Sequence, residues 1–539
     1  MPPTGWRIDS GAVLRDLGAA GVTKGASADL KPGLSEIESE GARPWFLYAL
    51  VFTVGTATLG CEIAAARLIA PFFGASTIVW ANTIAVVLVS LALGYWLGGR
   101  IADRYPHLRG LCLVVIIAAA ILAIVPFASR PFFDVSVDAL DSIEAGAFVG
   151  SLLAVLVLLA VPLVLLGACS PYAVRLAVPD VEHSGTVAGR LFAVSTAGSL
   201  LGTMLAALVT IPFLGTRLSF LLFAFAIAVM ASIGLGRWAS IAPVAILSLA
   251  VIPQGVVKQP ASGEKVLWEG DTEAQYARVL GEADGDRRLE LNEGVAQHSV
   301  WRPNSYLTDA NYWDGLLVLP FATERGAPRR VAILGNAAGT SQRAFAHFFP
   351  GVEVDGVEID PELTELGRRY FDLRTDADLR VHHADARPWL RSSEGDFDLI
   401  IVDAYRQPYI PFYLTTKEFF DLVADRLAPG GMAVVNVGHP EGNDDLERVV
   451  TAGMASAFGY VKRDAVTETN TLVMASQEEI TGEQLLEALP ALPEELRNQA
   501  AIEATRISAA LRGGDVYTDD RAPVEWLIDR SIVGYATGG

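Results

Sequence analysis

A glycine-containing turn and three acidic residues stand at the ends of predicted strands in the C-terminal half of the chain. Gly335 and Gly339 follow the apolar run VAIL, and Glu358 ends the next apolar run. Asp385 and Asp403 follow two further runs, in HHADARPWL and FDLIIVDAY. The carboxyl ends of parallel strands meet at one edge of a doubly wound sheet, so these residues are predicted to line one crevice. The glycines let the backbone approach a ligand, and Glu358 can accept hydrogen bonds from a ribose diol.

The order of these residues suits an adenosyl nucleoside. The glycine turn would lie against the nucleoside or its amino-acid tail, and Glu358 would bind the ribose hydroxyls. Asp385 could accept from the adenine amino group, and Asp403 would face the reacting centre. The P-loop pattern is absent from the sequence, so phosphoryl transfer is not favoured. Simpler alternatives stay open: an ordinary strand–helix–strand turn, a helix cap at Asp385 and a turn cap at Asp403.

Apolar runs that alternate with helix-compatible segments predict the sheet on which these residues stand. The runs lie at 330–334, 353–358, 379–382, 398–402 and 432–437, and two more strands are expected near 460–463 and 471–475. This alternation predicts a doubly wound, Rossmann-like α/β domain over residues 326–539, with a helical C-terminal segment. Short alternating runs such as VLWEG and RRLELNEG predict a small antiparallel β domain over residues 265–325.

Residues 45–253 are far more apolar and predict a membrane domain of six or seven helices. Most of the apolar runs reach the ~17–25 residues that a helix needs to cross the hydrocarbon of a bilayer. The last run has only 14 residues and would lie shallow or re-entrant in the alternative with six spans. A mobile tail, residues 1–44, precedes this domain, and a linker, residues 254–264, follows it. The seven runs are 45–66, 77–97, 111–127, 148–169, 191–213, 218–235 and 239–252.

Arginines between the runs predict the orientation of the helices. Arg100, Arg104 and Arg109 follow the second run, Arg175 and Arg190 follow the fourth, and the loop after the third is acidic. Loops rich in Lys and Arg stay in the cytoplasm, so the even-numbered loops and the N-terminus are placed there. Six crossings would leave residues 254–539 in the cytoplasm, and seven would leave them outside. We expect a multi-pass protein of the cell membrane with a cytoplasmic soluble part.

Two ionisable residues, Glu62 and Arg67, lie in the first apolar run, in CEIAAARLIAPFFG. Ionisable groups at membrane depth are costly and therefore indicate a functional role. The alternative is that the two pair with each other near an interface, or that the Arg67 side chain extends to the membrane surface.

The net charge of −20 falls entirely on the soluble part, because residues 254–539 hold 27 basic and 47 acidic groups. Such a surface repels phosphate backbones, so a nucleic-acid partner is not expected, whereas cationic small molecules would be attracted. The three cysteines lie in apolar runs without a C-x-x-C pair, so neither a disulfide framework nor a metal site is indicated.

At this point the sequence resembles the spermidine synthase family, in its membrane-fused form. The segments that carry the resemblance are AQYARV, LNEGVAQ, DANYWDGLLVLP, GNAAG, VEID, ADA and IIVDAY. The resemblance covers roughly residues 265–475. It implies nucleoside contacts at Gln275, Gly335, Gly339, Glu358, Asp385 and Ala386, substrate contacts at Gln297, Tyr312 and Tyr405, and a catalytic Asp403.

The resemblance implies transfer of an aminopropyl group from decarboxylated S-adenosylmethionine to an amine or polyamine, with release of methylthioadenosine. Asp403 would accept the proton of the attacking amine or orient it, and Tyr312 could assist. Ordinary S-adenosylmethionine in the same geometry would deliver a methyl group, which makes a methyltransferase one alternative. The resemblance implies no metal, and a homo-oligomer is one option for the assembly.

Two departures from the family pattern favour another alternative. Ala338 stands where the family has an aspartate in its glycine loop, and Arg406 stands where the catalytic loop has a second acid. The lost carboxylates would hold the ammonium ends of the two substrates, and an arginine reverses the local charge. These changes favour a non-catalytic transporter or sensor whose soluble domain binds an adenosyl nucleoside or a polyamine.

Overall fold

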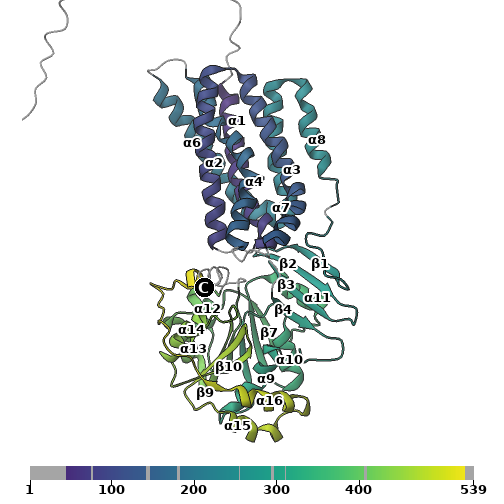
Figure 1. Ribbon diagram of the computed structural model, residues 1–539, viewed down its shortest axis with the longest axis vertical. Helices are drawn as coiled ribbons and strands as arrows, with labels where there is room; N and C mark the ends of the chain where they lie inside the picture. The colour runs from purple at the N-terminus through teal and green to yellow at the C-terminus, as the bar shows by residue number, and fades with distance from the viewer. Residues whose placement is uncertain are drawn as a thin grey trace, which may run out of the picture. The chain divides into compact units, whose positions relative to one another are not determined.

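The computed structural model describes most of the chain after residue 43 (Figure 1). The predicted N-terminal tail, apart from Pro44, lies outside the described residues, as does Arg406. The described residues are 44–73, 77–140, 146–178, 183–253, 255–272, 274–292, 296–309, 311–405 and 410–527.

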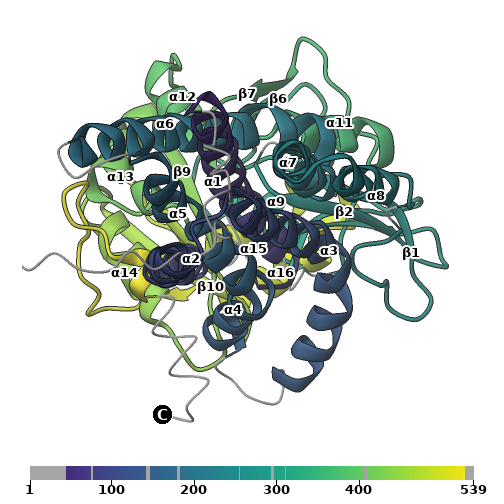
Figure 2. The ribbon, with the colours of Figure 1, turned by 90° about the horizontal axis from the view of Figure 1, so that it is seen from above.

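Apolar helices fill the first half of the described chain. In a bilayer, backbone N–H and C=O groups find no water, and a helix pairs them internally. α1 packs against both α6 and α7 (Figure 2). An added Cβ at Gly198 or Gly202 of α6 would lie 2.2 or 2.0 Å from a backbone oxygen of α1, so these glycines allow the close approach. The helices are α1 (Pro44–Phe73), α2 (Thr77–Arg104), α3 (Leu108–Leu140), α4 (Gly146–Gly167), α5 (Cys169–Ala177), α6 (Ser184–Leu205), α7 (Ile211–Leu235) and α8 (Ile241–Leu249).

Within the described residues, five helical segments are long and apolar enough to cross a membrane. The last of them, Ser184–Leu235, has 52 residues and contains a non-helical residue, Gly215, at φ +79°. It therefore includes both the fifth and the sixth predicted runs. The final apolar helix, Arg237–Leu249, spans about 20 Å at 1.5 Å per residue, less than the ~30 Å of a hydrocarbon core. The number of helices that cross stays a prediction.

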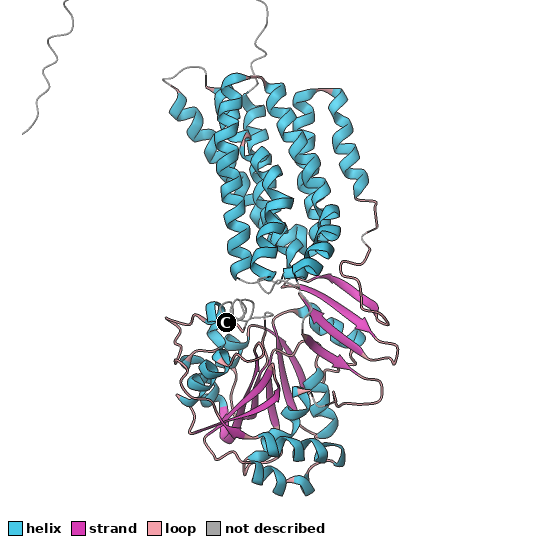
Figure 3. Ribbon diagram, in the orientation of Figure 1, coloured by secondary structure: helices cyan, strands magenta, loops and turns pink. Residues whose placement is uncertain are grey.

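A four-stranded antiparallel sheet follows, in the order β1-β2-β3-β4 (Figure 3). Its strands are β1 (Lys265–Asp271), β2 (Tyr276–Gly281), β3 (Arg287–Leu291) and β4 (Gln297–Trp301). Ala277, Val279 and Leu289 face one side and pack against Ala338 and Phe371 of the next domain. Because strand side chains alternate between faces, Arg278 and Glu290 stand on the other side and form an ion pair.

The remaining strands form an eight-stranded sheet in the order β12-β10-β11-β9-β8-β5-β6-β7. β9, β8, β5, β6 and β7 are parallel, and β11, β10 and β12 add antiparallel strands at one edge. The strands are β5 (Arg330–Leu334), β6 (Glu353–Glu358), β7 (Leu379–His383), β8 (Phe397–Val402), β9 (Leu427–Gly438), β10 (Tyr460–Thr467), β11 (Asn470–Ser476) and β12 (Ser508–Ala509).

Helices cover both faces of this sheet. One apolar core includes Leu334 and Val402 with residues of α12–α14, and the other includes Ile333 and Ile401 with residues of α9, α10, α15 and α16. The predicted fold class is thereby confirmed: apolar helices, a small antiparallel sheet and a doubly wound α/β domain. These helices are α9 (Tyr312–Val318), α10 (Thr340–Phe348), α11 (Pro361–Tyr370), α12 (Ala386–Ser392), α13 (Lys417–Arg426), α14 (Asp445–Ala455), α15 (Gly482–Glu487) and α16 (Glu494–Arg506).

Candidate functional site

β5 lies between β6 and β8 in the sheet. The chain therefore adds β6 and β7 on one side of β5 and then crosses over to add β8 and β9 on the other side. In doubly wound sheets, ligands bind at the carboxyl ends of the strands beside such a reversal. The predicted residues stand at these ends: Gly335 after β5, Glu358 at the end of β6 and Asp403 after β8. The structure thus brings together three of the four strand-end positions on which the sequence prediction depended.

The turn after β5 requires glycine at its first position. Gly335 has φ +99°, and an added Cβ would lie 2.3 Å from the backbone oxygen of Asp403. Gly339 has φ +87° and precedes the first residue of α10. The backbone N–H of Gly335 donates to Val357 O at 2.9 Å, which ties the turn to the neighbouring strand. The turn is therefore fixed by backbone contacts and passes within van der Waals distance of the segment that carries Asp403.

Glu358 is held by the backbone. Its Oε2 accepts from Ala337 N of the glycine turn at 2.8 Å, and its Oε1 accepts from Asp360 N at 2.9 Å. The side chain is only 6% exposed, and burial raises the pKa of its carboxyl group to about 7. A carboxylate offers about four acceptor positions, so this one can still accept from a ligand hydroxyl.

Asp403 lies in a hydrogen-bond network that spans three elements. The Tyr312 hydroxyl, from the first residue of α9, donates to Oδ2 at 2.9 Å, and Asn436 Nδ2, from β9, donates to Oδ1 at 2.8 Å. Loss of water raises the pKa of Asp403 to about 6, although both donors favour the charged form. Burial and the Asp403 charge raise the pKa of Tyr312. Asp403 is therefore poised to take a proton near neutral pH, and Tyr312 stays a donor.

The sequence prediction did not include Asn436 or Asn470, the residue that holds the Asn436 side chain. Asn470 Nδ2 on β11 donates to Asn436 Oδ1 at 2.8 Å, which turns the amide group of Asn436 toward Asp403. The signal was present, because Asn436 interrupts the apolar run MAVVNVG of a central strand. A buried polar residue at such a position needs a partner.

Tyr405 and Asp385 have local partners. Tyr405 donates to Asn436 O at 2.7 Å and accepts from Gly438 N at 2.8 Å, so its hydroxyl clamps β9. Asp385 caps α12 by accepting from Arg387 N at 3.1 Å, and its other oxygen accepts from the Tyr413 hydroxyl at 2.7 Å. The capping alternative for Asp385 is thus realised. Contacts of Asp385, Ala386 and Tyr405 with a ligand stay predictions.

The two predicted glutamines differ in exposure. Gln275 is 8% exposed and lies just before β2, whereas Gln297, the first residue of β4, is exposed. β4 reaches the glycine turn through a residue that the sequence did not indicate, Ser299, whose Oγ accepts from Ala338 N at 3.0 Å. Ligand contacts of both glutamines stay predictions.

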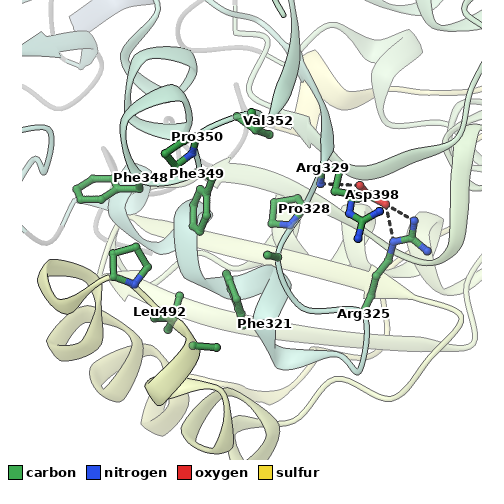
Figure 4. A pocket seen from close by; sticks show the side chains of 14 residues that line it. Phe321, Arg325, Pro328, Arg329, Phe348, Phe349, Pro350, Val352, Asp398 and Leu492 are labelled. Carbon is green, nitrogen blue, oxygen red and sulfur yellow. Dashed lines mark hydrogen bonds and ion pairs between the residues drawn. The ribbon is translucent and has the colours of Figure 1, made fainter.

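The structure has a pocket of about 860 Å³ at the opposite ends of the strands (Figure 4). There, Asp398 at the start of β8 accepts from Arg325 Nε and from the backbone N–H of Arg329. Phe321, Phe349 and other apolar side chains line the pocket. None of the predicted site residues does, so the pocket is separate from the candidate site.

The parallel sheet, the glycine turn and the strand-end acids define a doubly wound, Rossmann-like domain with a candidate ligand site at the carboxyl ends of its strands. Residues 315–473 match the family model described as the spermine/spermidine synthase domain. The C-terminal part of this chain is therefore similar to the spermine/spermidine synthase domain, as the resemblance predicted.

Two curated relatives and one solved structure show the range of similarity. A probable polyamine aminopropyl transferase of Bifidobacterium longum is 30% identical over 280 residues, which are 48% of this chain and 61% of the relative. A polyamine aminopropyltransferase of Vibrio vulnificus is 35% identical over 20% of this chain and 38% of the relative. The crystal structure of a probable spermidine synthase from Corynebacterium glutamicum is 21% identical, covers 48% of this chain and 98% of its own, and has a TM-score of 0.36.

Proposed function

We propose that this protein transfers an aminopropyl group from decarboxylated S-adenosylmethionine to an amine acceptor. The observation that carries the proposal is the network at Asp403, a carboxylate with a pKa of about 6 held by Tyr312 and Asn436. Asp403 follows β8, and Glu358, the acid predicted to bind the ribose, ends β6; a single strand, β5, lies between these two strands. The relatives named as polyamine aminopropyltransferases support the same reaction.

In the proposed reaction, the amine nitrogen attacks the propyl carbon bonded to the sulfonium. The new N–C bond forms as the C–S bond breaks, and its electron pair moves to sulfur, which gives neutral methylthioadenosine. Ionised Asp403 accepts the proton that the amine loses, and Tyr312 keeps the carboxylate in place. Glu358 holds the ribose and thereby fixes the sulfonium carbon relative to Asp403.

A second candidate function, nucleoside binding without transfer, is favoured by Ala338. Its side chain is 1% exposed and belongs to an apolar cluster with Leu363, Leu366 and Phe371. The glycine turn therefore presents no carboxylate from this position to the ammonium end of a donor. Arg406, the other departure from the family pattern, lies outside the described residues.

One experiment separates these functions and the methyltransferase alternative. The full-length protein in detergent is incubated with decarboxylated or ordinary S-adenosylmethionine and with putrescine, cadaverine or spermidine, and the nucleoside products are measured. Methylthioadenosine that appears only with an amine supports aminopropyl transfer, and S-adenosylhomocysteine supports methylation. Binding of the donor without either product would leave only the sensor function.

The cytoplasmic location of the soluble part stays a prediction, and two contacts oppose it. Arg67 of α1 donates to Thr272 O and Thr216 of α7 donates to Asp271, both at the end of β1. Arg67 lies near the junction of α1 with α2, whereas Arg104 ends α2. If α2 crosses the bilayer with Arg104 inside, these contacts stand on the outer side. Fluorescence of a C-terminal green fluorescent protein would support the cytoplasm, and activity of a C-terminal alkaline phosphatase would contradict it.

A further inference from the structure

Thr272, the residue after β1, joins the two halves of the candidate nucleoside site. Its side chain is 1% exposed. Its Oγ1 accepts from Gln275 N at 3.0 Å, which fixes the loop that carries the predicted nucleoside-contacting glutamine. The same oxygen lies within hydrogen-bond distance of Asp360 Oδ2 in the α/β domain. A single hydroxyl group therefore connects the antiparallel sheet to the segment that follows β6.

The direction of this contact follows from the proton count. A threonine hydroxyl has one proton, and its two acceptors are Gln275 O at 2.8 Å and the Asp360 carboxylate. Hydrogen bonds to ionised acceptors are about twice as strong as those between neutral groups, so the proton points to Asp360.

Asp360 passes the constraint on to Glu358. Its side chain is fully buried, and its Oδ1 accepts from Glu362 N at 3.1 Å, so it caps α11. Its backbone N–H donates to Glu358 Oε1 at 2.9 Å. Thr272 thus fixes the side chain of the residue whose backbone orients the predicted ribose-binding carboxylate. No step in the proposed reaction uses Thr272 or Asp360 directly.

Two helices of the apolar bundle hold the same short segment. Arg67 Nη1 of α1 lies 3.4 Å from Thr272 O, and Thr216 Oγ1 of α7 donates to Asp271 Oδ2 at 2.7 Å. Thr216 is 5% exposed and follows Gly215, where α7 leaves helical geometry. Arg67, which the sequence marked as a costly ionisable residue in an apolar run, therefore contacts the segment next to the nucleoside site.

We propose that Thr272 is a positioning residue for nucleoside binding, which orients Glu358 through Asp360, and that Arg67 and Thr216 make the apolar helices part of this support. The inference rests on the proposed nucleoside site and does not depend on the transfer reaction. It assigns the helix bundle a role in ligand affinity, in addition to any role in anchoring.

The first test compares two probes with the full-length protein in detergent. Methylthioadenosine carries both ribose hydroxyls, and 2′,3′-dideoxyadenosine carries neither. Thr272→Val should weaken methylthioadenosine binding roughly tenfold, the effect of one misplaced charged hydrogen bond, and leave the dideoxy probe unchanged. Thr272→Ser, which keeps the hydroxyl, should bind both probes as the wild type does. An equal loss for both probes in Thr272→Val would mean a merely structural role and overturn the proposal.

A double-mutant cycle tests the path through Glu358. In a Glu358→Gln background, Thr272→Val should cause less than a twofold further loss of methylthioadenosine affinity, because the group it orients is already altered. If the two substitutions lower methylthioadenosine affinity independently, so that their effects multiply, the proposed route from Thr272 through Asp360 to Glu358 is overturned.

The contacts from the apolar helices are tested with their own variants. The role of the helices can therefore be judged even if Thr272→Val fails to fold. Arg67→Gln and Thr216→Val should each weaken methylthioadenosine binding about threefold and spare the dideoxy probe. Thr203→Val is the matched control, because Thr203 on α6 donates to Ser199 O of its own helix at 3.1 Å. Unchanged binding in both variants would overturn the role of the helices.

The wild-type protein separates the two proposals. If it binds methylthioadenosine but forms no product from decarboxylated S-adenosylmethionine, the transfer reaction fails and the positioning role stands on the binding data. If it binds no adenine nucleoside at all, the positioning role is overturned together with the nucleoside site.

Discussion

Asp403→Asn is the replacement that tests the proposed chemistry most directly. The asparagine has nearly the same shape, and its oxygen can still accept from either Asn436 or Tyr312. Its amide nitrogen can only donate, and of the two neighbours only the Tyr312 hydroxyl oxygen can accept from it. The change therefore removes the negative charge and the proton acceptor while it keeps the volume of the side chain.

The expected size of the effect follows from the role of the carboxylate. Loss of a positioned base typically lowers a rate by about 10²–10⁴-fold, so we expect kcat to fall within that range while the affinity for methylthioadenosine changes little. The pKa of about 6 sets the pH dependence of the wild type. Asp403 is ionised above this value, so the rate should be level near pH 7.5 and fall about tenfold per pH unit below 6.

The assay is release of methylthioadenosine by full-length protein with decarboxylated S-adenosylmethionine and the acceptor that the product screen identifies. Asp385→Asn is the matched control, since Asp385 stands at the same sheet edge and caps α12. It should leave the pH dependence of kcat unchanged. Asp403→Asn that keeps more than a tenth of the wild-type kcat, or a wild-type profile without a fall below pH 6, would refute the role of Asp403 as the base.

Four further predictions concern Asp403 and the groups near it. Tyr312→Phe removes a donor to the charged form of Asp403, so the acidic limb of the pH–rate profile should move up by roughly 0.5–1 unit and kcat should fall about tenfold. Glu358, with a pKa of about 7, is a better acceptor when ionised. Methylthioadenosine affinity of the wild type should therefore rise several-fold from pH 6 to 8, and that of Glu358→Gln should not. The raised pKa also means that the stability contributed by protonated Glu358 is lost as pH rises from about 4.5 to 7. The thermal stability of Glu358→Gln should therefore increase relative to that of the wild type over this pH range. If the difference in unfolding midpoint between the two proteins does not change with pH, the burial argument is wrong. Gly335→Ala should lower the midpoint of thermal unfolding by several degrees, since its Cβ would lie 2.3 Å from Asp403 O, whereas Gly351→Ala, at φ +86° with no atom within 4 Å of its Cβ, should cost less.

The sequence alone was enough to predict the fold and to place the candidate site residues at the carboxyl ends of the strands. Strands are indicated by apolar runs and turn residues, which are local features of the sequence. The predicted strands at 330–334 and 353–358 therefore agree with β5 and β6. Gly335 could be singled out because a turn directly after a strand demands a backbone that other residues rarely adopt. The strand-end positions of Glu358 and Asp403 then followed from the geometry of parallel sheets.

The tertiary structure decided which partners these residues have. Tyr312 is 91 residues from Asp403 along the chain, and Asn436 is 33 residues away, so no local pattern pairs them. The structure also shows Asp385 as the N-cap of α12. The sequence left open whether this residue caps a helix or accepts from the adenine amino group.

The same limit applies to the contact between Arg67 and Thr272, which are 205 residues apart. The sequence showed that an arginine in an apolar run needs a partner, because burying a charge is costly, but any polar group in the chain could meet that need. Chemistry that depends on residue type and short spacing is thus determined by the sequence. The pKa of a carboxylate and the support of a ligand-binding residue are determined by long-range packing, since desolvation and hydrogen bonds act only between groups that folding brings together.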